Sequence, residues 1–267
     1  MRRIVRCRGL VVAIIALTSA LFSPPAWGDT TPTEGGWRVE FTPILWAPSL
    51  DAKTTVGGFS SDVDLSFSDI VDHADEVFGL SGRLETRKGP WGLFVETIFI
   101  AVTANFTVGP VSTELENDFG IYHFGANYRL VEKPLPGAMR LLFDLSGGIR
   151  HTYLKQLVSA TGSPPFTTSL GGSEDWYEPV IGAAGVLYLT ERLLIGLRGD
   201  AGGFGIGEAA KLSWFLTAGL GYHVSPGAVL KGGYQVYGLD FKGGGGTNTI
   251  GFDGNLHGPI LGVTFIF

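Results

Sequence analysis

Cysteine is almost absent from this chain of 267 residues, since Cys7 is its single instance and no disulfide can form within it. Charged residues are also scarce, at 16% against roughly a quarter in an average soluble domain. Their balance is acidic, with a formal net charge of −6, so the chain lacks the basic surface that a nucleic-acid partner requires. The 41 glycines have no three-residue period, which excludes collagen, and a hydrophobic content of 45% excludes a disordered chain.

Residues 1–28 have the pattern of a secretory signal peptide. Four arginines in the first eight residues precede an apolar run from Leu10 to Phe22, and Ala26-Trp27-Gly28 provides small residues for cleavage. We therefore expect the mature chain to begin at Asp29 with a short periplasmic segment, residues 29–36. Cys7 lies before the apolar run, so it cannot be the lipid-bearing residue of a lipoprotein.

Long hydrophobic runs are missing from the rest of the chain. The longest uncharged stretch, Leu212 to Leu230, contains His223 and is broken by a turn at Ser225-Pro226-Gly227. The dominant pattern is instead an alternation of period two, which places polar and apolar side chains on opposite faces of extended segments.

This alternation predicts ten strands between residues 37 and 267, joined by two kinds of connection. The short turns are Lys88-Gly89-Pro90, Val131 to Ala138, Thr190-Glu191-Arg192 and Ser225-Pro226-Gly227. The long loops are Ala47 to about Asp75, Asn105 to Asn117, Leu154 to Asp175, Gly205 to Ala210, and Lys242 to Asp253. Short turns alternating with long loops are typical of an all-β, antiparallel, up-and-down transmembrane barrel. Eight or twelve strands remain open, because the first loop has room for a hairpin from Leu50 to Val56.

The cost of burying charge in lipid decides which face points outward. A charged side chain at the bilayer midplane costs roughly 2 to 4 kcal/mol, so the charged rows must face the lumen. The predicted lumen charges are Arg38, Glu40, Arg83, Glu85, Arg87, Glu96, Arg129, Arg140, Asp144, Arg150, Arg198, Asp200 and Lys231. The predicted aromatic girdles at the membrane interfaces are Trp37, Trp46, Trp91, Tyr128, Trp214, Tyr222, Phe265 and Phe267. A ten-stranded lumen containing so many long arginines should be plugged or very narrow, with buried ion pairs.

Two parts of the chain resemble known proteins. The end, Leu261-Gly262-Val263-Thr264-Phe265-Ile266-Phe267, resembles the terminal strand of outer-membrane barrels, and Pro259 and His257 interrupt its alternation. Residues 37–105 resemble a broad group of uncharacterised proteobacterial outer-membrane barrels of the small OmpW or OmpA kind. The matching pieces are Leu45-Trp46-Ala47, Asp64, Ser66 to Ile70, Glu85-Thr86-Arg87 and Gly89 to Leu93. The resemblance implies the cell outer membrane as location, its lipids as partners, and recognition by the barrel assembly machinery through the strand ending in Phe267.

The sequence predicts a structural or surface-exposed role without catalysis, and two alternatives stay open. The first is a small pore or carrier for small or apolar solutes. The second is an outer-membrane hydrolase. A protease of the omptin type would use acids near the rim, and Asp144, Glu178, Asp200 and His151 are the candidates. His223-Val224-Ser225 has the spacing of a lipid deacylase pair, but we expect it to face inward at a tight turn.

No cofactor or metal site is predicted. The first loop contains Asp62, Asp64, Asp69, Asp72, His73, Asp75 and Glu76, and this set lacks the Gly and the distal Glu of a calcium loop. The residues from Ser68 to Phe78 are expected to form one or two helical turns with Ser68 as the N-cap. Lys242 to Thr247 is a flexible glycine-rich loop, because no Gly-Lys-Ser/Thr follows it.

Overall fold

The computed structural model describes residues 36–108, 111–162, 166–206 and 210–267. The predicted signal peptide and residues 29–35 lie outside this part of the chain. The first strands are β1 (Arg38–Trp46), β2 (Ser49–Val56), β3 (Phe59–Leu65), β4 (Glu76–Lys88), β5 (Trp91–Val108) and β6 (Val111–Pro134). The others are β7 (Arg140–Gly162), β8 (Phe166–Tyr188), β9 (Leu193–Gly203), β10 (Leu212–Ser225), β11 (Ala228–Gly243) and β12 (Ile250–Ile266). Two helices, α2 (Phe67–His73) and the 3₁₀ helix η1 (Gly246–Asn248), complete the set.

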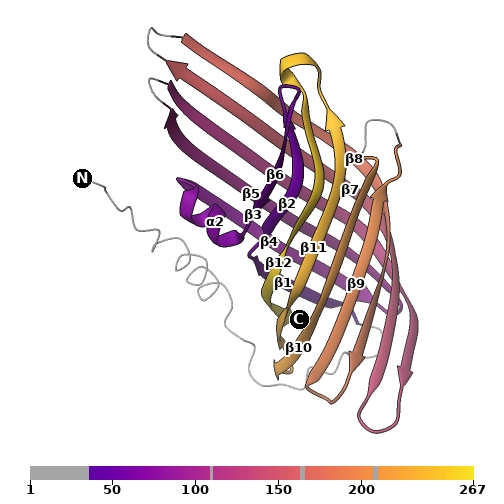
Figure 1. Ribbon diagram of the computed structural model, residues 1–267. Coiled ribbons are helices and arrows are strands. Elements are labelled where there is room, and N and C mark those ends of the chain that lie inside the picture. Colours follow the sequence, from indigo (N-terminus) through magenta and orange to yellow (C-terminus); the bar gives the residue numbers. More distant parts are fainter. Residues whose placement is uncertain (1–35, 109–110, 163–165, 207–209) are drawn as a thin grey trace. The chain divides into compact units, whose positions relative to one another are not determined.

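Ten of the strands form a closed antiparallel barrel (Figure 1), which confirms the predicted fold class. Each of β4 to β11 pairs with the next strand in the chain, and β1 pairs with both β4 and β12 to close the circle. The seam is continued by Val39 and Phe267, whose backbone groups exchange hydrogen bonds of 3.1 and 2.9 Å. We refer to the end of the barrel that has the short turns as the turn end, and to the opposite end as the loop end.

The two further strands form a hairpin within the segment predicted as the first loop. β2 continues the register of β1 along β12, since Trp46 pairs with Ile260 and Ser49 with His257. Gly57 and Gly58, both at positive φ, form the turn to β3, as two-residue hairpins require. β4 pairs with β1 only as far as Gly82. β3 pairs instead with β2, on the edge of β2 that does not face β12.

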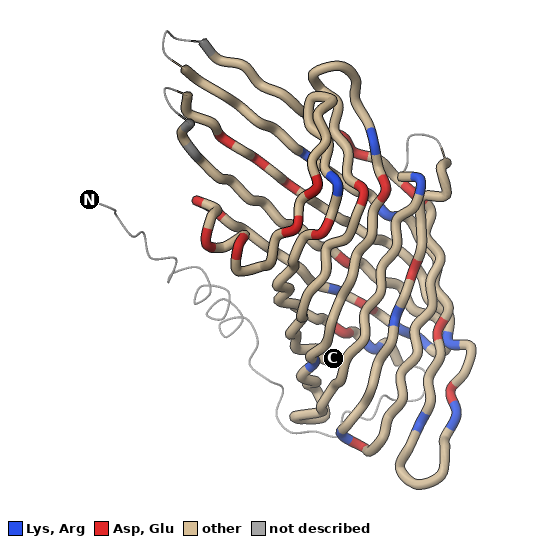
Figure 2. Tube along the Cα trace, viewed as in Figure 1, with Lys and Arg blue, Asp and Glu red and all other residues tan. Residues whose placement is uncertain are grey.

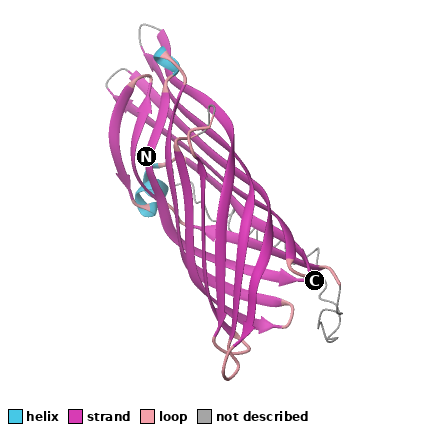
Figure 3. Cartoon of the chain, turned by 90° about the vertical axis from the view of Figure 1, so that its right-hand side faces the viewer, coloured by secondary structure: helices cyan, strands magenta, loops and turns pink. Residues whose placement is uncertain are grey.

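Several strands are longer than the sequence predicts. The stretches expected as loops at 105–117 and 154–175 are largely paired in β5, β6, β7 and β8, and half of 242–253 is paired in β11 and β12. The strands run obliquely along the barrel (Figure 3). On β6 and β7 the outward row changes from apolar to charged at Asp118 and Lys155, which form part of an outer ion-pair cluster with Glu116. This change marks where the outer face leaves an apolar environment.

The short helix α2 is placed by its N-cap, which is Ser66 and not the predicted Ser68. The Ser66 hydroxyl accepts a hydrogen bond of 3.2 Å from the Asp69 amide, and the Asp69 carboxylate accepts one of 3.0 Å from the Ser66 amide. This reciprocal pair is a capping box. Among the described residues, no helix has the length and the apolar content to cross a membrane.

The outer face of the barrel is apolar around its circumference. Trp91, Ile181 and Leu220 are 61%, 65% and 56% exposed, although a water-soluble fold would bury such side chains. Charged side chains of β4, β6 and β7, among them Arg83, Arg129 and Asp144, line a cavity inside the barrel instead. Figure 2 marks the positions of the charged residues along the backbone trace. An apolar outer belt around a polar interior is the arrangement of a barrel that spans a lipid bilayer.

The interior at the loop end is filled by an apolar core. Its members are Ala52, Ile98, Phe119, Ile121, Leu154, Trp176, Ala210, Phe215, Tyr237, Leu239, Phe241, Ile250 and Phe252. Trp176 of β8 and Phe241 of β11 stack across the interior with ring centroids 3.8 Å apart. Near the outermost part of this core, a Cβ atom added at Gly171 of β8 would lie 2.9 Å from a methyl group of Val56 of β2, so opposite walls of the barrel approach each other closely. The interior is therefore packed like a two-layer sandwich at this end.

Candidate functional site

The candidate site is the charged interior between the turn end and the apolar core. Nine side chains there form a continuous series of ion pairs in alternating sign, which we call the charge chain. It runs through Asp144, Arg87, Glu85, Arg83, Glu96, Arg198, Asp200, Arg150 and Glu178. These residues come from β4, β5, β7, β8 and β9, all at inward positions of the alternating pattern.

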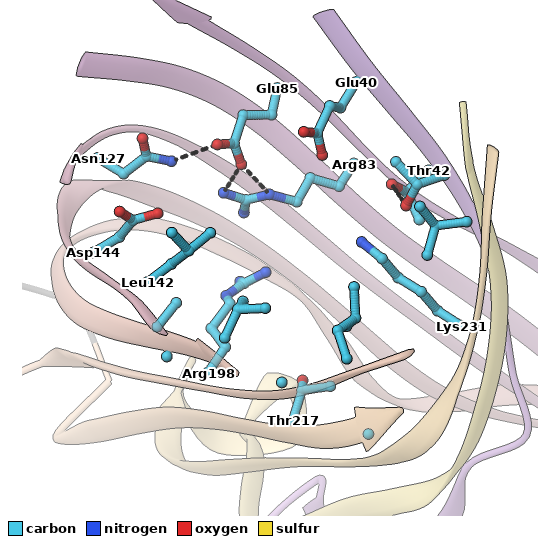
Figure 4. Close-up of a pocket in the computed structure, with 18 of the residues that line it drawn as sticks. Glu40, Thr42, Arg83, Glu85, Asn127, Leu142, Asp144, Arg198, Thr217 and Lys231 are labelled. Carbon is cyan, nitrogen blue, oxygen red and sulfur yellow. Dashed lines mark hydrogen bonds and ion pairs between the residues drawn. The ribbon is translucent and has the colours of Figure 1, made fainter. Parts of the chain in front are cut away.

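The part of the charge chain near the turn end lies on β4 and its neighbours. Arg83 binds Glu85 at 2.9 Å and Glu96 at 3.0 Å, while Arg87 binds Glu85 at 3.1 Å and Asp144 at 2.8 Å. Glu85, Glu96 and Asp144 therefore each contact two arginines. A buried carboxylate needs such partners, because an unpaired buried charge is costly. Figure 4 shows Glu85 between Arg83 and Asn127, whose amide donates to it at 2.9 Å.

The opposite end of the charge chain is deeply buried. Arg150, Glu178 and Asp200 have side chains that are only 1%, 0% and 2% exposed. Arg150 lies 3.4 Å from Glu178, contacts Asp200, and donates to Ser213 at 2.8 Å. Glu178 also accepts from the Trp176 indole at 3.1 Å, so this ion-pair layer is bonded directly to the apolar core above it.

A cavity of about 510 Å³ lies between the buried ion pairs of Arg150 and the turn end. It extends from Gly89, in the β4–β5 turn, to Glu96 and Arg198. Glu132 and Arg140 form its rim, with side chains 51% and 44% exposed. The cavity is thus open at the turn end. Its inner end is the layer formed by Arg150, Glu178 and Asp200, which we call the Arg150 layer.

One wall of the cavity is made of small residues, which is why the space exists. β9 and β10 present Gly196, Gly219 and Thr217 to it, opposite the arginines of β4. A Cβ atom added at Gly196 would meet nothing within 4 Å. Inward glycines therefore leave room that the long side chains of the other wall do not fill.

The remaining predicted lumen charges also line this cavity. They are Arg38, Glu40, Arg129, Arg140 and Lys231. Arg38 pairs with Glu40 at 2.8 Å, and Arg129 bridges Asp144 and Glu132. Lys231 of β11 points into the cavity (Figure 4).

Several interior residues lie outside the predicted set. Asn127, Ser213 and Gln235 are buried and polar. Each stands at an inward-pointing position of its alternating strand. The alternation of period two is therefore sufficient to identify them as interior residues. Their contacts across the lumen, such as Arg150 to Ser213, could not have been found in this way, because they depend on which strands face each other.

The predicted girdle residues lie on the outer face, with one exception. Trp37, Trp91, Tyr128, Tyr222 and Phe267 are exposed there, and Trp214 and Phe265 are partly exposed. The prediction for Trp46 is wrong. Its side chain packs against the apolar core, because even-numbered positions of β1 point inward.

The residues considered for hydrolysis are not brought together. Asp144, Glu178 and Asp200 are inside the barrel and paired with arginines. His151 is on the outer face, stacked on Tyr177 with ring centroids 4.5 Å apart, and lies 3.2 Å from Asp175. The barrel wall therefore separates His151 from the inner acids.

The acidic segment of the predicted first loop is divided between β3, α2 and β4 at the loop end (Figure 2). Within the ranges that the structure describes, no group of three or more His, Cys, Asp or Glu side chains is arranged to hold a metal ion. His223, considered with Ser225 as a deacylase pair, lines the rim of the inner cavity at the turn end.

Comparisons with known proteins show only distant similarity. No protein-family model matches the chain, and no curated protein matches it. Among solved structures, the outer membrane protease OmpT from Escherichia coli has 11% identity and a TM-score of 0.45, over 90% of this chain and 99% of OmpT. Ail of Yersinia pestis has 13% identity and a TM-score of 0.33, over 88% of this chain and all of Ail. The NanC porin has 11% identity and a TM-score of 0.29, over 86% and 99%. No residue role carries over at such identities.

Proposed function

We propose that this chain is an integral β-barrel of the outer membrane of a Gram-negative bacterium, closed toward the cell exterior, with a structural or surface-exposed role and no catalysis. The apolar belt supports a location in the membrane. A closed barrel can cross lipid because all of its backbone hydrogen bonds are made between its own strands. In such barrels the short turns face the periplasm and the long connections face outward. The turn end is then periplasmic and the loop end extracellular.

The observation that carries this function is the double closure of the lumen. The Arg150 layer is at most 2% exposed at each of its three charged side chains, and the Trp176 and Phe241 rings stack directly above it. A conducting pore needs a continuous aqueous path, and packed aromatic rings exclude one. The lumen charges then stabilise the barrel through mutual pairing and do not select a passing solute.

The extracellular strands support a surface-exposed role. β6, β7 and β8 each continue past the outward-facing Asp118, Lys155 and Asp175 toward the loop end. Outer-membrane lipids would surround the belt below these charges. The assembly machinery would act on the strand that ends at Phe267, which closes the seam against β1.

Single-channel recording on the refolded protein in planar bilayers tests the closure. We expect no stable conductance steps at any voltage that the bilayer tolerates. Stable steps in the nanosiemens range would overturn the proposal and favour the pore. Cleavage of lipid or peptide by the purified protein, abolished by Glu178→Gln together with Asp200→Asn, would favour the hydrolase.

A further inference from the structure

We propose that the cavity at the turn end is a binding site for a small organic anion with carboxylate or phosphate oxygens, held by Lys231 and Gln235. This site goes beyond the proposed structural role, and it does not depend on the proposed location in the outer membrane. Its volume of about 510 Å³ falls within the range of ligand pockets, which is roughly 300 to 1,000 Å³.

Lys231 is the cation that the barrel's own acids leave over. Among the residues that the structure describes, no carboxylate lies within the 4.0 Å ion-pair distance of its ammonium group. An ammonium group held inside a protein without a paired carboxylate is costly, and an anionic ligand would provide that partner. In Figure 4, Lys231 reaches into the open part of the cavity with no dashed line joining it to a neighbour.

The charged side chains that line the cavity have a net positive charge, which also favours an anionic ligand. Seven cations face the cavity, namely Arg38, Arg83, Arg87, Arg129, Arg140, Arg198 and Lys231, against the five carboxylates Glu40, Glu85, Glu96, Glu132 and Asp144. All five carboxylates already have arginine partners. A cationic ligand would find no free acid, whereas an anion finds an excess of two positive charges in a chain that is acidic as a whole.

Gln235 provides a second contact on the same strand face. Its side chain is 3% exposed, and its amide nitrogen is buried without a hydrogen-bond partner. Its amide oxygen accepts from Thr217 at 3.4 Å, which orients the nitrogen as the free donor. An unsatisfied buried donor costs about 1 to 3 kcal/mol, and a ligand oxygen would satisfy it.

The spacing of the two groups limits the ligand. Lys231 and Gln235 are four positions apart on β11, so their Cα atoms are separated by about 13 Å. Gly233 lies between them on the same face and adds no side chain. The nearby His123 has a buried Nε2 atom that also lacks a partner. A ligand with oxygens at both ends fits this row better than a single small ion.

Titration calorimetry on the full chain in detergent tests the site, with citrate and inorganic phosphate as probes and putrescine and glucose as controls. We expect citrate, phosphate or both to bind, and the neutral and cationic controls not to bind. Binding of citrate alone identifies a carboxylate site, and binding of phosphate alone identifies a phosphate site. Lys231→Gln should weaken binding about tenfold or more, as expected for loss of a charge-assisted hydrogen bond. Lys231→Arg should retain most of it.

The matched control is Lys211→Gln, which removes a lysine that is 77% exposed and lies outside the cavity. This variant should bind as the unmodified chain does. Equal losses in both Lys→Gln variants would overturn the site, as would the absence of anion binding at millimolar concentrations or stronger binding of putrescine. If Lys231→Gln does not fold, Gln235→Leu replaces it, and unchanged anion binding in that variant would contradict the proposal.

Discussion

Arg150 of β7 and Asp200 of β9 contact each other inside the barrel, although β8 lies between their strands. Both side chains are at most 2% exposed. Glu178, from the intervening β8, contacts the same guanidinium at 3.4 Å. One arginine therefore pairs with two buried carboxylates on two strands, and Arg198 provides a second cation for Asp200 at 3.5 Å. Together Arg150, Glu178 and Asp200 form the layer that closes the cavity.

Arg150→Met should be strongly destabilising. It leaves Glu178 and Asp200 buried without their shared cation, and removal of one partner from a buried ion pair costs about 3 to 5 kcal/mol. Urea unfolding in detergent, followed by tryptophan fluorescence, measures the change in the free energy of unfolding. The control is Arg140→Met at the exposed rim, where the loss should be about 1 kcal/mol or less. Equal losses in the two variants would show that the Arg150 layer has no special role.

Ile181→Arg tests which face of the barrel meets lipid. Ile181 is 65% exposed on the outer face of β8. An arginine at the membrane midplane should cost about 2 to 4 kcal/mol in lipid vesicles. Ser173→Arg lies on the same face of the same strand, beyond Asp175, and should cost little. A similar stability for both variants in vesicles would contradict the proposed membrane span.

The pKa of Asp69 should report on the capping box of α2. The hydrogen bonds from the Ser66 hydroxyl and backbone amide lower the pKa of this carboxyl below its ordinary value. Since the folded pKa is the lower one, this carboxylate stabilises the helix start above the unfolded pKa, and the contribution is lost as pH falls through the folded pKa. A carbon-13 NMR titration of the side chain should show a higher pKa in Ser66→Ala. An unchanged titration would refute the capping contact.

Gly171→Ala should destabilise the loop end, whereas Gly172→Ala should not. Gly171 has φ +98°, and a Cβ atom there would lie 2.0 Å from the Gln156 carbonyl oxygen. Non-glycine residues at such backbone angles cost on the order of 1 to 3 kcal/mol. At Gly172 the nearest atom would be 3.5 Å away, which is ordinary contact. Urea unfolding of the two variants makes the comparison, and equal stability would contradict the close approach at Gly171.

The barrel and the orientation of its faces could be predicted from local sequence, because parity is fixed by neighbours two positions apart. Arg83 and Glu85 illustrate this, since both face inward with the other charges of β4. The β2–β3 hairpin lies in the segment where the sequence left room for a hairpin from Leu50 to Val56, and Gly57-Gly58 is its turn signal. The prediction for Trp46 is wrong because it rested on the place of an aromatic residue at a strand end, whereas its even position, shared with Arg38 and Glu40, puts it inside the barrel.

The closure of the lumen could not be predicted in detail. The stacking of Trp176 on Phe241 joins residues 65 positions apart, and it depends on how the circle of strands flattens at the loop end. The cavity has the same origin. Gly196 leaves open space in the cavity wall, and the sequence does not show which strands face it across the barrel.

Thiol labelling from the outside of intact cells tests the closed lumen most directly. The predicted mature chain has no cysteine, so Ser146→Cys in the cavity and Ser173→Cys on the outer face of β8 each provide a single target. With a maleimide too large to cross porins, Ser173→Cys should be labelled in intact cells, and Ser146→Cys only after the outer membrane is opened. Labelling of Ser146→Cys in intact cells at the rate of Ser173→Cys would show that the lumen is open to the exterior.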